Sequence, residues 1–496
     1  MSTETAIPAI EHSRPAPAPN FEDFSPGIEA IFADQFQECD CVVATTGDKL
    51  PDFLHGAYYL NGPARFGFGD DLSYGHWLDG DGMVSSLHFG ENEIRLKSRY
   101  IRSRKFQEEQ SAGRPLFRTF GTAFPGSQLN RAHNGLESPV NVSVYPFGNG
   151  LLAFGEQGLP WELDPVTLET RGQFTFKGRL NDASPFSAHP KFDPETGEMF
   201  NFGIFFSAQA PRLYFYCFKD EHLVYRKAVP LEYSCSVHDF SISRTYAIFY
   251  LSPYLLEING LLKDGQTVME SLHWEPGRGS RLLILDRKTG EQVMSLPVGH
   301  RHCLHLINSF EEDNRLTVDV VEFDEPLYGY YQPIPDLFSN VSHGGPVRFA
   351  IDLHAREIIE RIALDYLKAP DFPAIDPRCA MSSYDDLWML GISTTGRQGR
   401  KFFDQLVHER WSEPSVCDVY QSPPMRYLGG EPVFIGEPDS EKGIIISQEF
   451  DAIAQRSSFL VFEAGQVARG PVTRIPLHES LYLGFHAVFR PEPFRP

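Results

Sequence analysis

Short runs of β-branched and aromatic residues recur along almost the whole chain, each bounded by glycine, proline, aspartate or asparagine. Four examples are residues 150–154, 246–251, 281–285 and 458–462. Runs of this length between turn residues are typical of β-strands, and helical periodicity is scarce. The motif Asp-x-x-Thr-Gly occurs twice beside such runs, at residues 193–197 and 286–290, and predicts a hairpin turn. The sequence therefore predicts an all-β protein.

The 496 residues contain no glycine/serine linker and no charged run that would divide them into separate units. A β-propeller fits this length better than one sandwich, because it adds blades around an axis without needing a second core. The first 20 residues are rich in proline, alanine, serine and threonine, and we expect residues 1–20 to be a disordered leader. Residues 21–496 are predicted to form one propeller domain. Within it, residues 25–35 and 253–263 are predicted to be helical, the first with Ser25 as N-cap and Pro26 as first helical residue.

Composition and charge argue against several partners and compartments. A formal net charge of −22 disfavours a nucleic-acid partner, because two polyanions repel each other. No window approaches about 18 uninterrupted apolar residues, the N-terminus does not resemble a secretory signal, and the seven cysteines are too scattered for a disulfide framework. We therefore expect a cytoplasmic protein. The 40 phenylalanines fit a large β core or, as the sharper alternative, the lining of a tunnel for a long apolar ligand.

The motifs of common hydrolases are missing from the sequence. It has no His-Glu-x-x-His, no phosphate-binding P-loop and no Gly-x-Ser-x-Gly, so zinc hydrolase, nucleotide hydrolase and esterase activities are disfavoured. Four of the 17 histidines, in contrast, each adjoin an apolar strand-like run: His189, His238, His305 and His486. A single histidine in such a context is more often a core or surface residue. The gaps of 49, 67 and 181 residues between these four place them on different blades of a propeller.

With these histidine contexts in view, the chain resembles the carotenoid cleavage oxygenase family from about residue 38 to the C-terminus. That family includes bacterial apocarotenoid oxygenases, plant carotenoid dioxygenases, an animal retinoid isomerase and lignostilbene dioxygenases. Asn61-Gly62-Pro63 and residues 76–84 (HWLDGDGMV) match its opening signature, and the four histidines match its iron ligands in order. Six matching segments in the right order make the resemblance specific. It implies a seven-bladed propeller capped by helices and loops, with Fe(II) held on the axis by four imidazoles.

The resemblance also implies three carboxylates that orient the ligand histidines through their other ring nitrogens. Glu156 and Glu431 match two of the family's three glutamates. The third normally lies in Glu-Phe-Pro, whereas this chain has Asp371-Phe372-Pro373. Aspartate is shorter by one methylene, so the backbone moves in, a water bridges the gap, or one imidazole is held more loosely. We expect Asp371 to be a working substitute.

Other residues of the matched segments are assigned structural roles. His76 lies in the opening signature but is expected not to bind metal, and three more histidines are expected in loops or on the surface: His300, His302 and His343. Asp79 and Asp81 lack the ligand spacing of a calcium loop and are expected to shape a turn. Leu60 stands where many relatives have arginine, so an ion pair common in the family is expected to be absent.

The resemblance implies cleavage of a carbon–carbon double bond of a carotenoid or apocarotenoid with O₂, which gives two carbonyl products, typically aldehydes. The substrate is then a lipophilic polyene. Three alternatives remain open: a stilbenoid-cleaving dioxygenase, an isomerase of the kind found in animal relatives, and a non-catalytic propeller scaffold. The stilbenoid enzymes hold a phenol with a tyrosine and a lysine near the iron, and residues 102–107 and 128–133 do not reveal that pair.

A water-insoluble substrate must be collected from a membrane, so we expect peripheral membrane contact around the tunnel mouth. Residues 204–206 and 254–262 fall at places comparable to the apolar patch of relatives. The second segment is predicted to be an amphipathic interfacial helix. A buried cap helix is an equally good interpretation of it.

Overall fold

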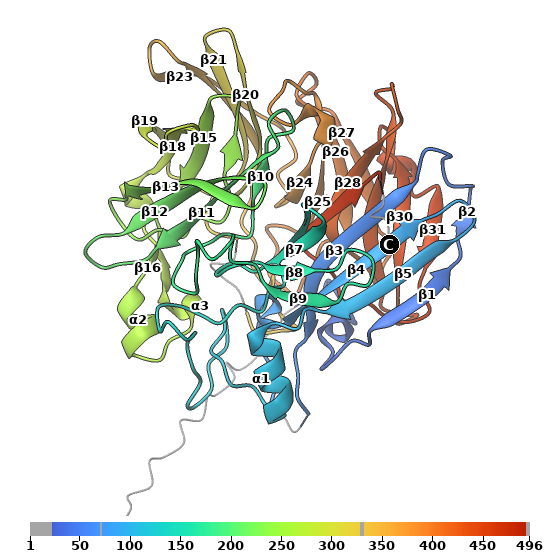
Figure 1. Ribbon diagram of the computed structural model, residues 1–496. Helices are drawn as coiled ribbons and strands as arrows, with labels where there is room; N and C mark the ends of the chain where they lie inside the picture. Colours follow the sequence, from blue (N-terminus) through green and yellow to red (C-terminus); the bar gives the residue numbers. More distant parts are fainter. Residues whose placement is uncertain (1–21, 70–71, 328–331, 493–496) are drawn as a thin grey trace, which may run out of the picture.

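Seven antiparallel sheets are arranged around an axis in the computed structural model, which describes residues 22–69, 72–327 and 332–492 (Figure 1). The protein is mostly β and forms a seven-bladed β-propeller with few helices, which confirms the predicted fold class. The predicted leader, residues 1–20, lies outside the described residues.

Two of the sheets have five strands. The first contains, in spatial order and ending at the axis, β1 (Cys39–Val43), β5 (Ile94–Tyr100), β4 (Asp81–Phe89), β3 (Gly56–Arg65) and β32 (Ala487–Arg490). The seventh contains, in the same sense, β2 (Thr46–Gly47), β31 (Thr473–Pro476), β30 (Arg456–Glu463), β29 (Gly443–Asp451) and β28 (Arg426–Gly436).

The other five sheets have four strands each, and each begins with its innermost strand. The second sheet is β6 (Ser143–Phe147), β7 (Gly150–Phe154), β8 (Trp161–Leu163) and β9 (Thr170–Gln173). The third is β10 (Lys191–Phe192), β11 (Glu198–Phe205), β12 (Arg212–Lys219) and β13 (His222–Pro230). The fourth is β14 (Ser241–Ile242), β15 (Tyr246–Leu251), β18 (Ser280–Asp286) and β19 (Gln292–Gly299). The fifth is β20 (His302–Glu312), β21 (Arg315–Phe323), β22 (Gly344–Asp352) and β23 (Glu357–Ala363). The sixth is β24 (Asp371–Ala374), β25 (Asp386–Gly391), β26 (Gln405–Arg410) and β27 (Cys417–Gln421).

The ring is closed by strands from both ends of the described chain. At the C-terminal end, β32 pairs with β3, with Ala487 opposite Leu60. Near the N-terminus, β2 pairs with β31, with Thr46 opposite Arg474. Each end of the chain thus supplies a strand to a sheet built mainly from the other end. This exchange joins the first and seventh sheets through backbone hydrogen bonds.

Local sequence determines the hairpin turns as predicted. In the turn at residues 193–197 the Asp193 carboxylate accepts hydrogen bonds from the backbone N–H groups of Glu195 (2.8 Å) and Thr196 (3.1 Å). Gly197 adopts a left-handed φ of 67°, which a residue without Cβ reaches at little cost. The turn at residues 286–290 repeats this arrangement. All four predicted strand runs lie within observed strands: β7, β15, β18 and β30.

Three short α-helices lie on one side of the propeller, at the bottom of Figure 1. They are α1 (Arg104–Ala112), α2 (Ile258–Lys263) and α3 (Val268–Ser271). The described residues also include five 3₁₀ turns: η1 (Ile28–Phe32), η2 (Trp77–Asp79), η3 (Pro276–Arg278), η4 (Pro377–Cys379) and η5 (Val467–Arg469).

Both helix predictions need correction. The first predicted helix is only the 3₁₀ turn η1, and Ser25 does not cap it, because Gly27 adopts a left-handed φ of 78° and a right-handed helix can begin only after it. The second predicted helix contains a strand followed by a short helix. Residues Tyr254–Leu256 form β16, which pairs with β17 (Leu272–Trp274), and only Ile258–Lys263 is helical. Trp274, the pairing partner of Tyr254, lies 20 residues further along the chain, and this strand pairing overrides the local helical pattern.

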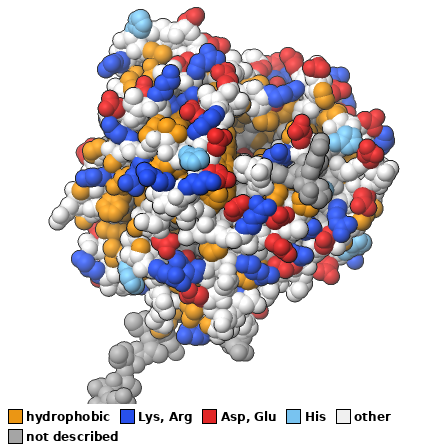
Figure 2. All heavy atoms as spheres, viewed as in Figure 1, with side chains coloured by type: hydrophobic (Ala, Val, Ile, Leu, Met, Phe, Trp, Pro, Cys, Tyr) orange, Lys and Arg blue, Asp and Glu red, His pale blue; other side chains and the backbone are white. Residues whose placement is uncertain are grey.

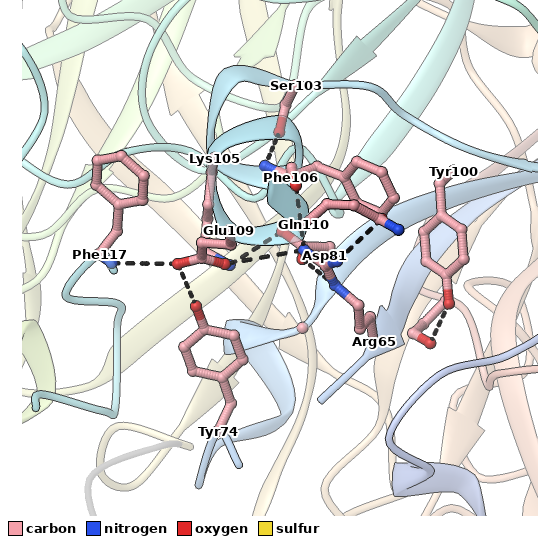
Figure 3. A network of polar contacts seen from close by, with 12 residues as sticks. Arg65, Tyr74, Asp81, Tyr100, Ser103, Lys105, Phe106, Glu109, Gln110 and Phe117 are labelled. Carbon is pink, nitrogen blue, oxygen red and sulfur yellow. Dashed lines mark hydrogen bonds and ion pairs between the residues drawn. The ribbon is translucent and has the colours of Figure 1, made fainter. Parts of the chain in front are cut away.

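A buried ionic cluster anchors α1 to the first sheet (Figure 3). Asp81 receives hydrogen bonds from Arg65 (2.5 Å) and from Lys105 (2.9 Å), and Lys105 also contacts Glu109 at 3.0 Å. The Tyr74 hydroxyl donates to Glu109 at 2.7 Å. None of the four charged side chains is more than 4% exposed. Two cations and two carboxylates thus balance one another inside the protein, which is what a buried charge requires.

The same cluster fixes the segment that follows α1. Glu109 accepts hydrogen bonds from the backbone N–H groups of Leu116 (3.0 Å) and Phe117 (3.1 Å). A second carboxylate, Asp79, accepts from the Gly121 N–H at 2.9 Å and from the Thr122 hydroxyl at 2.5 Å. Asp79 therefore shapes a turn as predicted, whereas Asp81 belongs to the ionic cluster. Together these contacts fix the segment of residues 116–122 against α1 and η2.

Candidate metal centre

The four histidines singled out in the sequence lie together around the propeller axis. His189 and His238 lie just before the innermost strands of the third and fourth sheets, His305 lies within β20, and His486 directly precedes β32. Their potential ligand atoms all lie within 4.8 Å of one another. Each histidine comes from a different sheet, so the closed ring brings together residues that are up to 297 positions apart (486 − 189).

Three carboxylates lie behind the imidazoles and contact their Nδ1 atoms. The His305 Nδ1 is 2.6 Å from Asp371, the His238 Nδ1 is 2.8 Å from Glu156, and the His486 Nδ1 is 3.3 Å from Glu431. Asp371 begins β24, Glu431 lies in β28, and Glu156 follows β7 by two residues. With the four histidines, each of the seven sheets contributes one side chain to the centre.

These contacts direct the Nε2 atoms toward one point. The Nε2 atoms of His189 and His238 are 2.8 Å apart, and the Nε2 of His305 is buried without a hydrogen-bond partner. A buried nitrogen lone pair without a partner is costly unless a ligand satisfies it. Four converging imidazole nitrogens suit a divalent first-row transition metal. The residues present therefore fit a metal ion held by His189, His238, His305 and His486.

The backbone around Asp371 is irregular. Phe372 adopts a left-handed φ of 54° and Ala369 one of 47°, and the pairing of β24 with β25 shifts register just after Asp371. A bulky residue in this region is strained, so the surrounding structure must stabilise it. The Asp371 carboxylate contacts the His305 Nδ1 directly at 2.6 Å, so no water bridges the two groups and the imidazole is not loosely held.

A fourth carboxylate, Asp239, was not anticipated from the sequence. Its Oδ1 lies 3.9 Å from the His189 Nδ1, and its Oδ2 accepts the Leu306 N–H at 2.9 Å. Lys191 contacts Asp239 at 2.8 Å. Asp239 thus supports the strand that carries His305 and places negative charge beside the one histidine without a close carboxylate partner. Its position directly after His238 was the available signal.

Burial and neighbouring charge shift the pKa values of groups in the centre in different directions. Burial and the surrounding imidazoles lower the pKa of His189 well below its usual range, so this ring is neutral. Burial also acts to lower the pKa of His238, but the charge of Glu156 outweighs it and the net shift is upward. Burial alone would raise the pKa of Asp371, but the imidazole of His305 and the Phe372 N–H lower it, so this carboxylate remains ionised.

Cavities adjoin the histidine cluster from two directions. The first, of about 330 Å³, is lined by His238, His305 and His486 together with apolar side chains that include Phe120, Phe202, Leu256, Leu304, Phe372 and Phe485. The second, of about 390 Å³, is lined by His189, His305 and His486 and by the charged side chains of Lys191, Asp239, Asp376 and Arg378. The centre therefore has an apolar side and a more polar side.

One of the histidine assignments is wrong. His302 was expected in a loop or on the surface, but it begins β20, is only 5% exposed and lines the first cavity. His300 and His343 lie outside the strands and are exposed, as predicted. His76 is buried, and its Nδ1 accepts the Leu78 N–H at 3.0 Å, in keeping with a structural role. Leu60 is fully buried in an apolar cluster.

The fold and this centre define the class of protein: a seven-bladed propeller that gathers four carboxylate-supported imidazoles beside an apolar cavity. The family model described as "Retinal pigment epithelial membrane protein" matches residues 32–491. The chain therefore belongs to this family, the carotenoid cleavage oxygenases.

Individual relatives are distant but match over nearly their full length. An isoeugenol monooxygenase from Pseudomonas putida is 27% identical, with 89% of this chain and 93% of that protein covered. An apocarotenoid-15,15'-oxygenase from Synechocystis is 25% identical, with 96% and 98% covered. A solved structure of a variant of the Synechocystis apocarotenoid oxygenase superposes with a TM-score of 0.83 at 22% identity, covering 95% of this chain and all of that one, which supports the fold.

Proposed function

We propose that this protein is a non-haem Fe(II) dioxygenase that cleaves a carbon–carbon double bond of a carotenoid or apocarotenoid with O₂. Both oxygen atoms enter the products, so one alkene and one O₂ give two carbonyl compounds, typically aldehydes. The observation that carries the proposal is the convergence of four imidazoles at the wall of an apolar cavity. His189, His238, His305 and His486 are the proposed ligands.

The chain's own residues orient the metal ligands, bind the substrate and exclude water from the cavity. Glu156, Asp371 and Glu431 hold the Nδ1 side of three imidazoles and thereby fix their tautomers and ring planes. Apolar side chains of the first cavity fix which double bond of the substrate faces the centre. When bound, iron(II) supplies the redox chemistry that joins O₂ to the double bond. No general acid or base is required of the protein.

The lining of the first cavity favours a carotenoid-type polyene. Most of its walls are apolar or aromatic, as a long hydrocarbon ligand requires. Its described lining residues include one tyrosine, Tyr254, but no lysine, so a tyrosine–lysine pair for a phenol is missing there. Lys105, in the stretch where that pair was sought, belongs instead to the buried ionic cluster.

A second candidate is an alkene conjugated to a phenol, as in a stilbenoid. The similarity to an isoeugenol monooxygenase favours it, because isoeugenol is a phenol with a conjugated propenyl double bond. The two candidates use the same centre and differ only in what the cavity holds.

Metal content and product analysis test the proposal together. The purified protein is assayed for iron and then incubated with β-carotene, an apocarotenal, resveratrol and isoeugenol, and the carbonyl products are identified. We expect one iron per chain and aldehydes from at least one substrate. His305→Ala is expected to lose both the iron and the cleavage activity. His300→Ala, at an exposed position five residues earlier in the sequence, is expected to retain both. Iron-free protein with no cleavage of any substrate would instead favour a scaffold.

We further propose that the protein works in the cytoplasm and contacts membranes peripherally to collect its substrate. None of the described helices is long and apolar enough to cross a membrane. Phe205 and Leu262 are 42% and 40% exposed and also line the first cavity, so they mark its mouth. Figure 2 presents a face on which acidic and basic side chains alternate with apolar patches. Leu255 and Leu261 are buried. Their burial favours a buried cap over an interfacial helix for most of residues 254–262.

A further inference from the structure

His302 is a buried polar side chain whose role the metal centre does not explain. It is 5% exposed and lines the first cavity, and its Nδ1 is buried without a hydrogen-bond partner. Tyr254 and Trp274 flank the ring edge-on, with centroids at 5.8 Å and 6.0 Å. A buried ring nitrogen left without a partner costs free energy comparable to a lost hydrogen bond. Such a group in a cavity is explained when a bound molecule supplies the partner.

The backbone of β20 aims His302 and His305 into the same cavity. Residues three apart in a regular strand point to opposite faces. Here the pairing of β20 with β21 shifts register between Cys303 and Leu306 and again between Leu306 and Asn308. These bulges re-aim the side chains, as bulges commonly do beside active sites. His302 and the proposed metal ligand His305 therefore line the same cavity, and the distance between them is fixed because both lie in β20.

Tyr254 is held in the same corner by backbone contacts near a second proposed ligand. Its carbonyl accepts the Ser236 N–H at 2.8 Å, two residues before His238. Burial raises the pKa of Tyr254 to about 12, so its hydroxyl stays protonated. Burial lowers the pKa of His302 to about 3, so its imidazole stays neutral and offers one donor and one acceptor. This corner suits a neutral oxygen group and not an ionised one.

We propose that His302, together with Tyr254, binds a neutral hydroxyl or carbonyl oxygen of the substrate and thereby sets how far from that oxygen the double bond is cleaved. The inference rests on the proposed function and narrows it to oxygenated substrates. The same chemistry is offered by a hydroxylated ring of an apocarotenoid and by the hydroxyl of a phenolic alkene. His302 is then a specificity-determining residue, and the metal centre carries the reaction.

Paired substrates that differ by one hydroxyl test the inference. The pairs are 3-hydroxy-β-apocarotenal with β-apocarotenal, and 4-hydroxystilbene with stilbene. His302→Phe keeps a ring but removes both nitrogens, and Tyr254→Phe removes only the hydroxyl. His300→Phe makes the same change at an exposed position and is the matched control. For each protein the ratio of kcat/KM for the hydroxylated over the plain substrate is measured, together with the thermal midpoint.

We expect the wild type and His300→Phe to prefer the hydroxylated member of one pair by roughly tenfold or more. His302→Phe lowers that ratio by roughly tenfold, and Tyr254→Phe lowers it by a smaller factor. The pair that responds identifies the source of the hydroxyl. A wild-type ratio near one for both pairs, or a ratio that His302→Phe and Tyr254→Phe leave unchanged while both variants fold, would overturn the inference.

A binding measurement separates this inference from the proposed function. Metal-free protein is titrated with the same pairs, and quenching of tryptophan fluorescence gives Kd without any turnover; Trp274 lies beside the proposed subsite. A Kd preference for the hydroxylated compound that His302→Phe removes supports the inference even if no substrate is cleaved. Cleavage without any such preference would leave the dioxygenase proposal standing and overturn the role of His302.

Discussion

His305 and Asp371 form the shortest of the three imidazole–carboxylate contacts behind the centre, with 2.6 Å between Nδ1 and Oδ1. Phe372, the next residue, has a left-handed φ of 54°, and its backbone N–H donates to the same Asp371 oxygen at 2.9 Å. The position of this carboxylate is therefore a property of the local backbone as much as of the side chain.

Replacing Asp371 with either a neutral or a longer side chain should weaken metal binding. Asp371→Asn removes the charge that holds the imidazole, and losses of about 10–100-fold in metal affinity are typical for such partners. Asp371→Glu should also weaken binding, because a direct contact of 2.6 Å leaves no room for another methylene in this backbone conformation. Iron content and Fe(II) affinity are the measurements. Asp376→Asn changes a carboxylate five residues further along the chain that pairs with Arg378, and it serves as the control. Unchanged affinity in Asp371→Glu would contradict the argument from the short contact.

Asp239→Asn should have a smaller effect on the same measurement. At 3.9 Å from the His189 Nδ1 the carboxylate acts through charge rather than through a short hydrogen bond. We expect a loss of Fe(II) affinity of several-fold, less than in Asp371→Asn, together with a lower thermal midpoint because the Leu306 N–H and Lys191 lose their charged partner. A loss as large as that of Asp371→Asn would show that Asp239 is a direct partner of His189 in solution.

The ionic cluster under α1 predicts a large stability effect from a neutral substitution. Lys105→Met leaves Asp81 and Glu109 buried with one cation between them, and removing one partner of a buried pair costs about 3–5 kcal/mol. Urea unfolding measures it. Lys227→Met removes a half-buried surface lysine, 41% exposed in its side chain, that pairs with Glu291 at 3.2 Å, and should cost about 1 kcal/mol or less. Equal effects of the two substitutions would contradict the buried-pair argument.

Glu409 predicts a pH dependence of stability. Burial raises its pKa from 4.5 to about 8, and its Oε2 has no hydrogen-bond partner. Between these values the folded state holds a proton that the unfolded state has released, so the free energy of unfolding falls as pH rises from about 4.5 to about 8. Glu409→Gln removes this titration. Its thermal midpoint should match that of the wild type near pH 4 and exceed it increasingly up to pH 8, whereas Glu413→Gln, at an exposed carboxylate, should show no such trend.

The strands and the histidine cluster were predictable because local sequence carries them. Runs such as residues 150–154 need only composition and flanking turn residues to be identified, and the four histidines each lie in a distinctive local context. Asp371 was predicted from the resemblance to orient a ligand histidine, but its direct 2.6 Å contact with His305 was only one of three open alternatives, because no pattern encodes the local backbone geometry. His302 was missed because bulges in β20 break the alternation that sequence analysis assumes. The prediction of a helix at residues 253–263 was wrong in its first half, because residues 254–256 pair with the strand at residues 272–274.

Membrane contact should depend on exposed residues at the cavity mouth and not on the leucines that the sequence pattern suggested. Leu255 and Leu261 are 7% and 1% exposed, so glutamate there would disrupt the fold before it affected any lipid contact. Phe205→Glu with Leu262→Glu adds charge at side chains that already face solvent, and we expect partition into anionic vesicles to fall several-fold with an unchanged thermal midpoint. Ile453→Glu, at a residue 74% exposed that does not line the cavity, is the control. If the double variant binds vesicles as well as the control, the cavity mouth is not the contact surface, because no stability change can account for that result.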